Sequence, residues 1–96
     1  MELLDPATVD AALADGMAWE RQGDELVKTR RGKDFPDALA YVNAVAALAE
    51  AMDHHPDIDI RWDTVTMRLT THSEGGLTDL DLELARRIDA LSGSGG

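Results

Sequence analysis

The chain has 96 residues, with 19 acidic against 9 basic side chains and a formal net charge of -10. This length supports one domain with a single modest core, and the negative charge disfavours direct nucleic-acid binding because a phosphate backbone would be repelled. The chain has no cysteine, no apolar run near the roughly 20 residues that span a bilayer, and no signal-peptide pattern at its start, so we expect a cytoplasmic protein without a membrane partner.

The first third of the chain predicts a short helix followed by a β-hairpin. Asp5 can cap a helix N-terminus and Pro6 is tolerated at the first helical position, so we predict a helix over 6–15. Strand-compatible residues over 17–31, interrupted by Gly23-Asp24, predict the hairpin. The only tight basic group lies at its end, and we interpret it as a solvated stretch: Lys28, Arg30, Arg31 and Lys33.

The rest of the chain predicts a long helix, a second hairpin and a last helix. Apolar residues recur at spacings of three and four over 34–52, which is typical of a helix with one buried stripe. Alternation of apolar and polar residues predicts strands over 57–62 and 64–72, joined by a tight turn. Thr78, with Asp81 three residues later, resembles a capping box and predicts the start of the last helix.

The order helix, two strands, helix, two strands, helix is typical of an α+β domain. We expect a four-stranded antiparallel sheet with three helices packed on one face. The domain would occupy residues 1–91 as a single unit. Glycine and serine dominate residues 92–96, which predicts a flexible tail.

The three histidines of the chain form its most distinctive cluster. His54 and His55 follow a predicted helix C-terminus, whose dipole favours protonated imidazole, and His72 ends the second strand of the later hairpin. Counting back from the hairpin turn places His72 across from position 54 or 55, so three imidazoles can meet at one sheet edge. Imidazole exchanges protons near neutral pH, and the cluster therefore favours general acid–base chemistry.

Other interpretations of the cluster remain open. Two histidines between Asp53 and Asp57 also suit an ordinary solvated loop, and Asp81 would stabilise its helix by about 0.3–1 kcal/mol for dipole reasons alone. The spacing does not favour a metal site, because adjacent histidines diverge and no pair at i, i+4 accompanies them. The serines lack the context of a nucleophile elbow, so a catalytic triad is disfavoured.

A set of short motifs resembles the pterin-4a-carbinolamine dehydratase family: Glu50 to Pro56 with the His-His pair, then Thr71-His72, Gly76-Leu77-Thr78 and Asp81. The resemblance is strong over 34–91 and extends weakly toward the N-terminus through Trp19 and Phe35. It implies the fold predicted above and a hydro-lyase that converts 4a-hydroxytetrahydropterin to quinonoid dihydropterin. It also implies that no metal or other cofactor is needed and that the protein forms a homodimer or homotetramer.

The resemblance also implies roles for individual residues. It assigns catalysis to His54, His55, His72 and Asp81, and substrate binding to Glu50, Asp53 and Thr71. One histidine would protonate the oxygen that leaves C4a and another would accept a proton from a ring nitrogen. The helix terminus favours His54 or His55 as the acid, but the sequence does not settle which histidine is acid and which is base.

Some positions depart from the family pattern. Ile58 stands where the family often has a tryptophan beside the pterin, and Trp62, Asp63 and Ser73 also differ from the common residues. Loss of the aromatic ring predicts weaker pterin binding or a preference for another ligand. The rival interpretation is a non-catalytic interaction or assembly module of the same fold, coactivator-like or chaperone-like. The complete set of histidines with Asp81 favours the enzyme.

Overall fold

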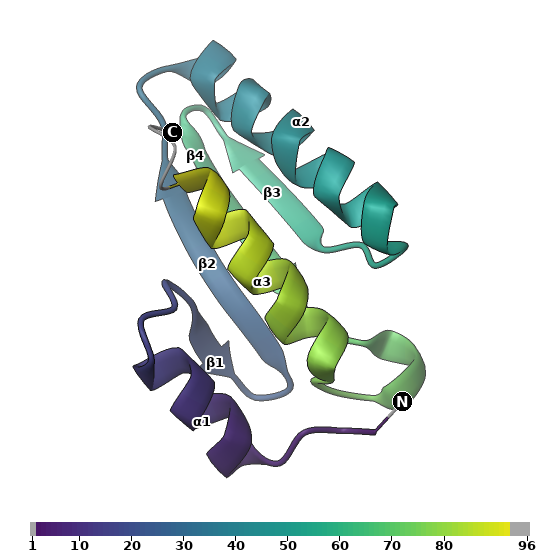
Figure 1. The fold of residues 1–96 in the computed structure, drawn as a ribbon. Coiled ribbons are helices and arrows are strands. Elements are labelled where there is room, and N and C mark those ends of the chain that lie inside the picture. Colours follow the sequence, from purple (N-terminus) through teal and green to yellow (C-terminus); the bar gives the residue numbers. More distant parts are fainter. Residues whose placement is uncertain (1, 93–96) are drawn as a thin grey trace.

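A computed structural model describes residues 2–92 and confirms the predicted fold class (Figure 1). Three α-helices and four strands follow one another as α1 (Pro6–Ala14), β1 (Glu20–Gln22), β2 (Glu25–Arg31), α2 (Phe35–Met52), β3 (Asp57–Arg61), β4 (Thr64–Leu69) and α3 (Asp79–Ser92). A short 3-10 helix, η1 (His72–Glu74), precedes α3. The predicted tail begins inside α3 at Ser92, and its residues 93–96 lie outside the described part of the chain.

The strand boundaries differ from the prediction at several ends: β1 begins at Glu20 rather than at 17, β3 ends one residue early at Arg61, and the end of β4 differs in a way that affects the site. The strand expected over 64–72 ends at Leu69, and Thr71 then forms an isolated bridge with Gly76 instead of continuing the ladder. Gly75 has a φ of 76°, which lets the chain turn back toward Thr71 after the 3-10 turn. The alternating pattern could not show this change. Thr71 has an extended backbone whether it pairs within the β4 ladder or forms an isolated bridge with Gly76.

The four strands form one antiparallel sheet in the order β1-β2-β4-β3. In the β2–β4 ladder, Leu26 lies opposite Leu69 and Lys28 opposite Met67, while Met67 also lies opposite Ile58 of β3. Side chains alternate along a strand, so these five residues share one face of the sheet. The residues between them, which are mostly polar, form the opposite face.

All three helices pack against that shared face. Figure 1 shows α3 crossing in front of β2 and β4, with α1 beside β1 and α2 on the side of β3. The buried residues form a single cluster between the helices and the sheet, with contributions from every helix and from β2 and β4. The fully buried large members are Val9, Leu26, Val45, Val65, Met67, Leu69, Leu84 and Ile88.

The basic group at the end of the first hairpin is only partly the solvated stretch that the sequence predicted: Arg31 and Lys33 are exposed, but Lys28 and Arg30 are not. Lys28 is buried and its Nζ lies 2.8 Å from Oδ1 of Asp89 on α3. The same carboxylate accepts hydrogen bonds from Nε1 of Trp19 at 2.9 Å and from the backbone nitrogen of Ala18 at 3.0 Å. Arg30 places its guanidinium over the ring of Tyr41, 4.3 Å from the centroid. Partners so distant in sequence leave no mark on a local charge pattern.

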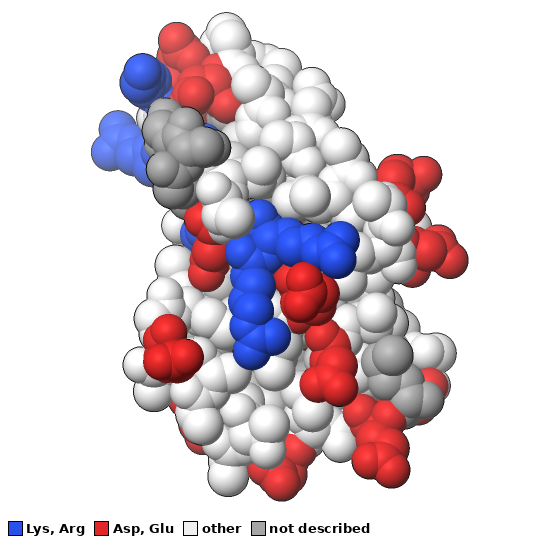
Figure 2. All heavy atoms as spheres, viewed as in Figure 1, with Lys and Arg blue, Asp and Glu red and all other residues white. Residues whose placement is uncertain are grey.

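The molecular surface carries the acidic excess of the composition. Figure 2 shows acidic side chains around the outline of the face seen in Figure 1, with basic side chains gathered over α3 and near one end of the molecule. Within the described residues, no helix has the length and apolar character needed to cross a membrane.

Candidate active site

The C-terminus of α2 positions the two adjacent histidines. The backbone nitrogen of His54 bonds to the oxygen of Ala49 at 3.1 Å, and that of Asp53 bonds to the oxygen of Glu50 at 3.2 Å. Asp53 adopts the left-handed conformation with φ 49° and ψ 44°. This pattern is a Schellman motif, in which the chain reverses direction directly after the helix. His54 is therefore turned back under the helix end, toward the core.

The N-terminus of α3 positions the acidic residue. The backbone nitrogen of Leu80 donates to Oγ1 of Thr78 at 3.3 Å, and Oδ2 of Asp81 accepts from the backbone nitrogen of Thr78 at 2.9 Å. These reciprocal bonds form the predicted capping box, with aspartate in place of the more common glutamate. Asp81 is completely buried. Capping occupies only one carboxylate oxygen and leaves Oδ1 available.

His54 and Asp81 meet in the interior of the protein. Nε2 of His54 lies 2.6 Å from Oδ1 of Asp81, and the histidine side chain is 9% exposed. Oδ2 of Asp81 also accepts a hydrogen bond from Oγ1 of Thr71 at 2.8 Å. Figure 1 shows the end of α2 and the start of α3 on the same side of the molecule, beside the segment that joins β4 to α3. Two helix ends and one strand end thus form the buried part of the site.

His55 and His72 lie nearer the surface. Nε2 of His55 lies 2.5 Å from Oε2 of Glu50, with both side chains more than half exposed. His72 is exposed at the start of η1, directly after Thr71. Asp53 is also exposed. The predicted site residues therefore gather around one end of the β3–β4 hairpin, at different depths.

The hairpin register explains which residues come together. Asp57 pairs with Arg68, so continuing the ladder in steps of one would place His54 opposite Thr71 and Asp53 opposite His72. The count made from the sequence placed His72 opposite 54 or 55, one or two residues away from this register. Thr71 and His54 do share a contact, through the carboxylate of Asp81.

Thr78 is the member of this network that sequence reasoning did not assign to the site. It was predicted only as a helix cap, but its Oγ1 also lies 2.8 Å from Oγ1 of Thr71 and its side chain is fully buried. The one signal in the sequence was its position directly after the apolar Leu77, which is itself buried. The position of Thr71 across the turn could not be read from the pattern.

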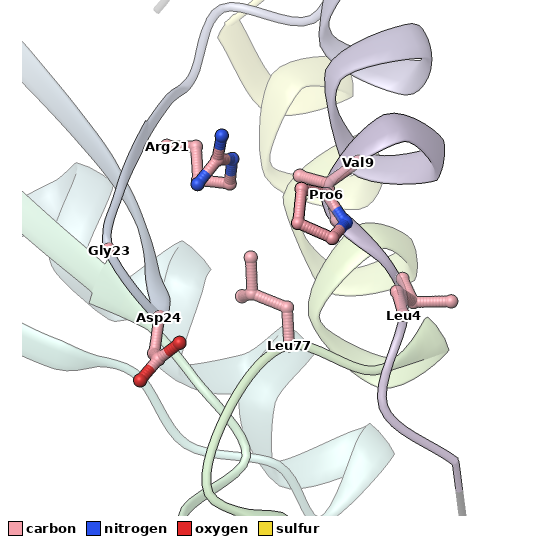
Figure 3. Close-up of a pocket in the computed structure, with 7 residues that line it drawn as sticks. All are labelled: Leu4, Pro6, Val9, Arg21, Gly23, Asp24 and Leu77. Atoms are coloured by element: carbon pink, nitrogen blue, oxygen red, sulfur yellow. The ribbon is translucent and has the colours of Figure 1, made fainter.

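A small cavity of about 80 Å³ lies on another part of the molecule (Figure 3). Leu4, Pro6 and Val9 line it on the side of α1, and Arg21 and Leu77 close it. Its volume is well below the roughly 300 Å³ of typical ligand pockets. Among the described residues, no group of three or more histidine or acidic side chains is arranged to hold a metal ion.

The comparison with protein families decides the relationship that the motifs suggested. The family model for pterin 4 alpha carbinolamine dehydratase matches residues 2–91. The chain belongs to the pterin-4a-carbinolamine dehydratase family. A protein from Nocardia farcinica that carries the family name is 53% identical over 91 residues, covering 95% of this chain and 96% of the relative. Another from Roseiflexus sp. is 52% identical over 88 residues and covers 92% and 95%.

Solved structures of dehydratase-family proteins have the same fold. A transcriptional coactivator/pterin dehydratase from Brucella melitensis superimposes with a TM-score of 0.87 at 31% identity, covering 93% of this chain and 97% of that one. A pterin dehydratase-like protein identified as a RuBisCO assembly factor in the alpha-carboxysome has a TM-score of 0.65 at 25% identity, covering 81% and 90%. The first of these proteins is thus described both as a coactivator and as a dehydratase, and the second as an assembly factor.

Proposed function

We propose that the protein dehydrates 4a-hydroxytetrahydropterin to quinonoid dihydropterin by histidine general acid–base catalysis. The observation that carries this proposal is the buried contact between His54 and Asp81. A carboxylate with several fixed donors holds one imidazole in a defined orientation, while a second imidazole, on His55, lies next to it in the chain with its own carboxylate partner. Family membership supports the substrate class.

The reaction needs two proton transfers and no redox partner. The hydroxyl group on C4a takes up a proton, the C4a–O bond breaks and water leaves. A ring N–H gives its proton to a base, and the electron pair of that bond forms the new C=N bond. One proton enters and one leaves, so the balance is the loss of one water. His54, His55 and His72 supply the acid and base, with either His54 or His55 as the acid because both follow the end of α2.

In this proposal Glu50 and Asp53 bind the substrate from the exposed side of the site. Glu50 also orients His55, since it contacts Nε2 of that ring. Thr71 lines the inner side. Ile58 is partly buried and packs against the core. It has no aromatic ring, so it offers less stacking area than the tryptophan often found in the family. We expect weaker pterin binding as a result, which calorimetry with a pterin ligand measures.

Replacement of each histidine by alanine tests the reaction directly. Dehydration of a 4a-hydroxytetrahydropterin is followed for the three variants, with Ser73→Ala, an exposed neighbour of His72, as the control. General acid–base groups contribute about 10²–10⁴-fold, so we expect losses of that order for the catalytic histidines and a wild-type rate for the control. Wild-type rates in all three histidine variants would exclude histidine catalysis, and a wild type no faster than the uncatalysed reaction would exclude the enzymatic function.

A second candidate is an interaction or assembly module, and an exposed apolar surface favours it. Phe35 and Trp62 stack with ring centroids 6.4 Å apart and planes 4° from parallel, although they are 41% and 69% exposed. Leu39 and Ile60 are the other large apolar residues exposed on α2 and β3. Exposed apolar groups of this kind often mark contacts with another protein. The two solved structures described above are named for coactivator and assembly roles.

The same surface is where we propose that the chain forms a homodimer or homotetramer. Light scattering of wild type and of the double variant Leu39→Glu, Trp62→Glu tests this: the wild type should be an oligomer and the variant a smaller species. A monomeric wild type would exclude self-assembly and leave this surface to another partner. The cytoplasmic location stays a prediction from the composition.

A further inference from the structure

Two threonine hydroxyls form a hydrogen-bonded chain that ends on the carboxylate of Asp81, the partner of His54. Oγ1 of Thr71 is 2.8 Å from Oδ2 of Asp81 and also 2.8 Å from Oγ1 of Thr78. All three side chains are buried, and Thr78 and Asp81 are completely so. The two threonines come from different segments, one after β4 and one at the start of α3. Their contact therefore links the segment after β4 to the N-terminus of α3, next to Asp81.

The number of protons available fixes the direction of these hydrogen bonds. A hydroxyl group has one proton to donate. Thr71 gives its proton to Oδ2 of Asp81, so in the contact between the threonines Thr78 must be the donor. Oγ1 of Thr78 in turn accepts from the backbone nitrogen of Leu80. The chain of donors therefore runs from Leu80 through Thr78 and Thr71 to Asp81, and each bond polarises the next.

This chain determines which atoms remain for His54. Oδ2 of Asp81 is filled by Thr71 and by the backbone nitrogen of Thr78, so Oδ1 faces the imidazole. A carboxylate can only accept, so Nε2 of His54 carries the hydrogen in this contact. In the neutral ring Nδ1 is then the nitrogen without a proton, and it is the atom that can exchange one with a substrate.

We propose that Thr71 and Thr78 are positioning residues that fix Asp81 and thereby hold His54 as the Nε2–H tautomer. This inference rests on the proposed function for its catalytic meaning, although the tautomer itself does not. It assigns the hydroxyl of Thr71 to Asp81 rather than to the substrate. Capping alone would need only an acceptor at Thr78, and it would need nothing at Thr71.

Ring nitrogen shifts of the histidines, measured by NMR on the full ¹⁵N-labelled chain, test the proposal without any activity. In the wild type we expect His54 as the Nε2–H tautomer, with slow exchange of that proton because Asp81 is buried. Thr71→Val leaves the cap of α3 intact and should give a mixture of tautomers with exchange at least about tenfold faster. Thr78→Val should act in the same direction, and Thr71→Ser and Thr78→Ser should restore the wild-type signals.

The ring of His55 provides an internal control, since its partner is Glu50 and its signals should not change. Wild-type tautomer and exchange in both valine variants would overturn the proposal. If a valine variant fails to fold, the serine variant at the same position still tests the proposal. Serine keeps the hydroxyl, so loss of the Nε2–H tautomer in that variant would contradict the role assigned to the hydroxyl.

Steady-state kinetics separate this proposal from the proposed function. We expect Thr71→Val to lower kcat about tenfold with KM within about twofold of wild type, and Thr71→Ser to recover the rate. A change confined to KM would instead assign Thr71 to substrate binding and overturn the positioning role. A wild-type protein that dehydrates no pterin would overturn only the proposed function. The NMR measurement would still test whether Thr71 and Thr78 hold the tautomer of His54.

Discussion

The side chains of the adjacent residues His54 and His55 lie in opposite environments, 9% and 55% exposed. Each has its own carboxylate: His54 contacts the buried Asp81 and His55 the exposed Glu50. The Schellman motif at the end of α2 causes this difference, because it turns one ring inward and leaves the next outside. The same substitution at these two neighbouring histidines should therefore change the stability of the protein by different amounts.

Alanine at His54 should destabilise the fold, whereas alanine at His55 should not. His54→Ala removes a hydrogen-bond partner of a buried carboxylate, which costs about 1–3 kcal/mol. His55→Ala removes an exposed contact and should change the free energy of unfolding by no more than about 0.5 kcal/mol. Urea denaturation of both variants measures the difference. Equal losses would mean that the two rings share one environment in solution.

Asp53 should show a conflict between stability and substrate binding. Its φ of 49° lies in the left-handed region, which costs a side-chain-bearing residue about 1 kcal/mol more than glycine. We expect Asp53→Gly to raise the free energy of unfolding by up to that amount and to raise KM for the pterin. Asp53→Asn tolerates the same backbone and isolates the loss of charge. An unchanged KM in both variants would remove Asp53 from the substrate site.

The hydroxyl of Tyr41 should be dispensable. It is buried and has no hydrogen-bond partner among the described residues, while its ring receives the guanidinium of Arg30. Tyr41→Phe keeps the ring and removes an unsatisfied polar atom, so we expect the free energy of unfolding to rise by about 1 kcal/mol. Thermal unfolding followed by calorimetry measures it. A loss of similar size would reveal a bound water or another partner for the hydroxyl.

The ion pair between Arg31 and Asp63 should make stability depend on pH in acid. The hydrogen bond from Arg31, followed by that from Thr64, holds the pKa of Asp63 below its ordinary value of 3.8. A lowered folded-state pKa stabilises the fold above pH 3.8, and this contribution disappears as the pH falls through the folded-state value. Arg31→Gln should therefore lower Tm at neutral pH, and its Tm should approach that of the wild type well below pH 3.8.

The control for this pair is Arg86→Gln, which removes the same charge from an exposed position on α3. Its Tm difference from wild type should not follow the titration of Asp63. Melting curves for wild type and both variants across acid pH supply the comparison. A constant Tm difference for Arg31→Gln at every pH would show that the pair does not act through the protonation of Asp63.

The sequence predicted the layout of this domain because its signals are local. Asp5-Pro6, the stripe along α2 and the alternation in β3 each depend on neighbours within a few residues, and the resulting elements match the structure. The site was predicted less completely. Asp81 carries the pattern of a helix cap, and only the resemblance to the family selected it as part of the site.

Contacts between distant segments account for the rest. The burial of Lys28 depends on Asp89, 61 positions later, and the role suggested for Thr78 depends on Thr71 across a turn. No local pattern encodes such pairs, because each residue alone has an ordinary explanation in its own element. The departure of Thr71 from the β4 ladder shows the same limit at the scale of a single hydrogen bond.

The position of α3 in the chain has a consequence for synthesis. This helix follows every strand, yet it supplies Asp81 to the site and Asp89 to the partly buried contact with Trp19. A nascent chain that has emerged only as far as β4 already has α1 and α2, but the part of the sheet that α3 covers is exposed and His54 lacks its acidic partner. The fold and the site therefore become complete together, only after α3 has left the ribosome.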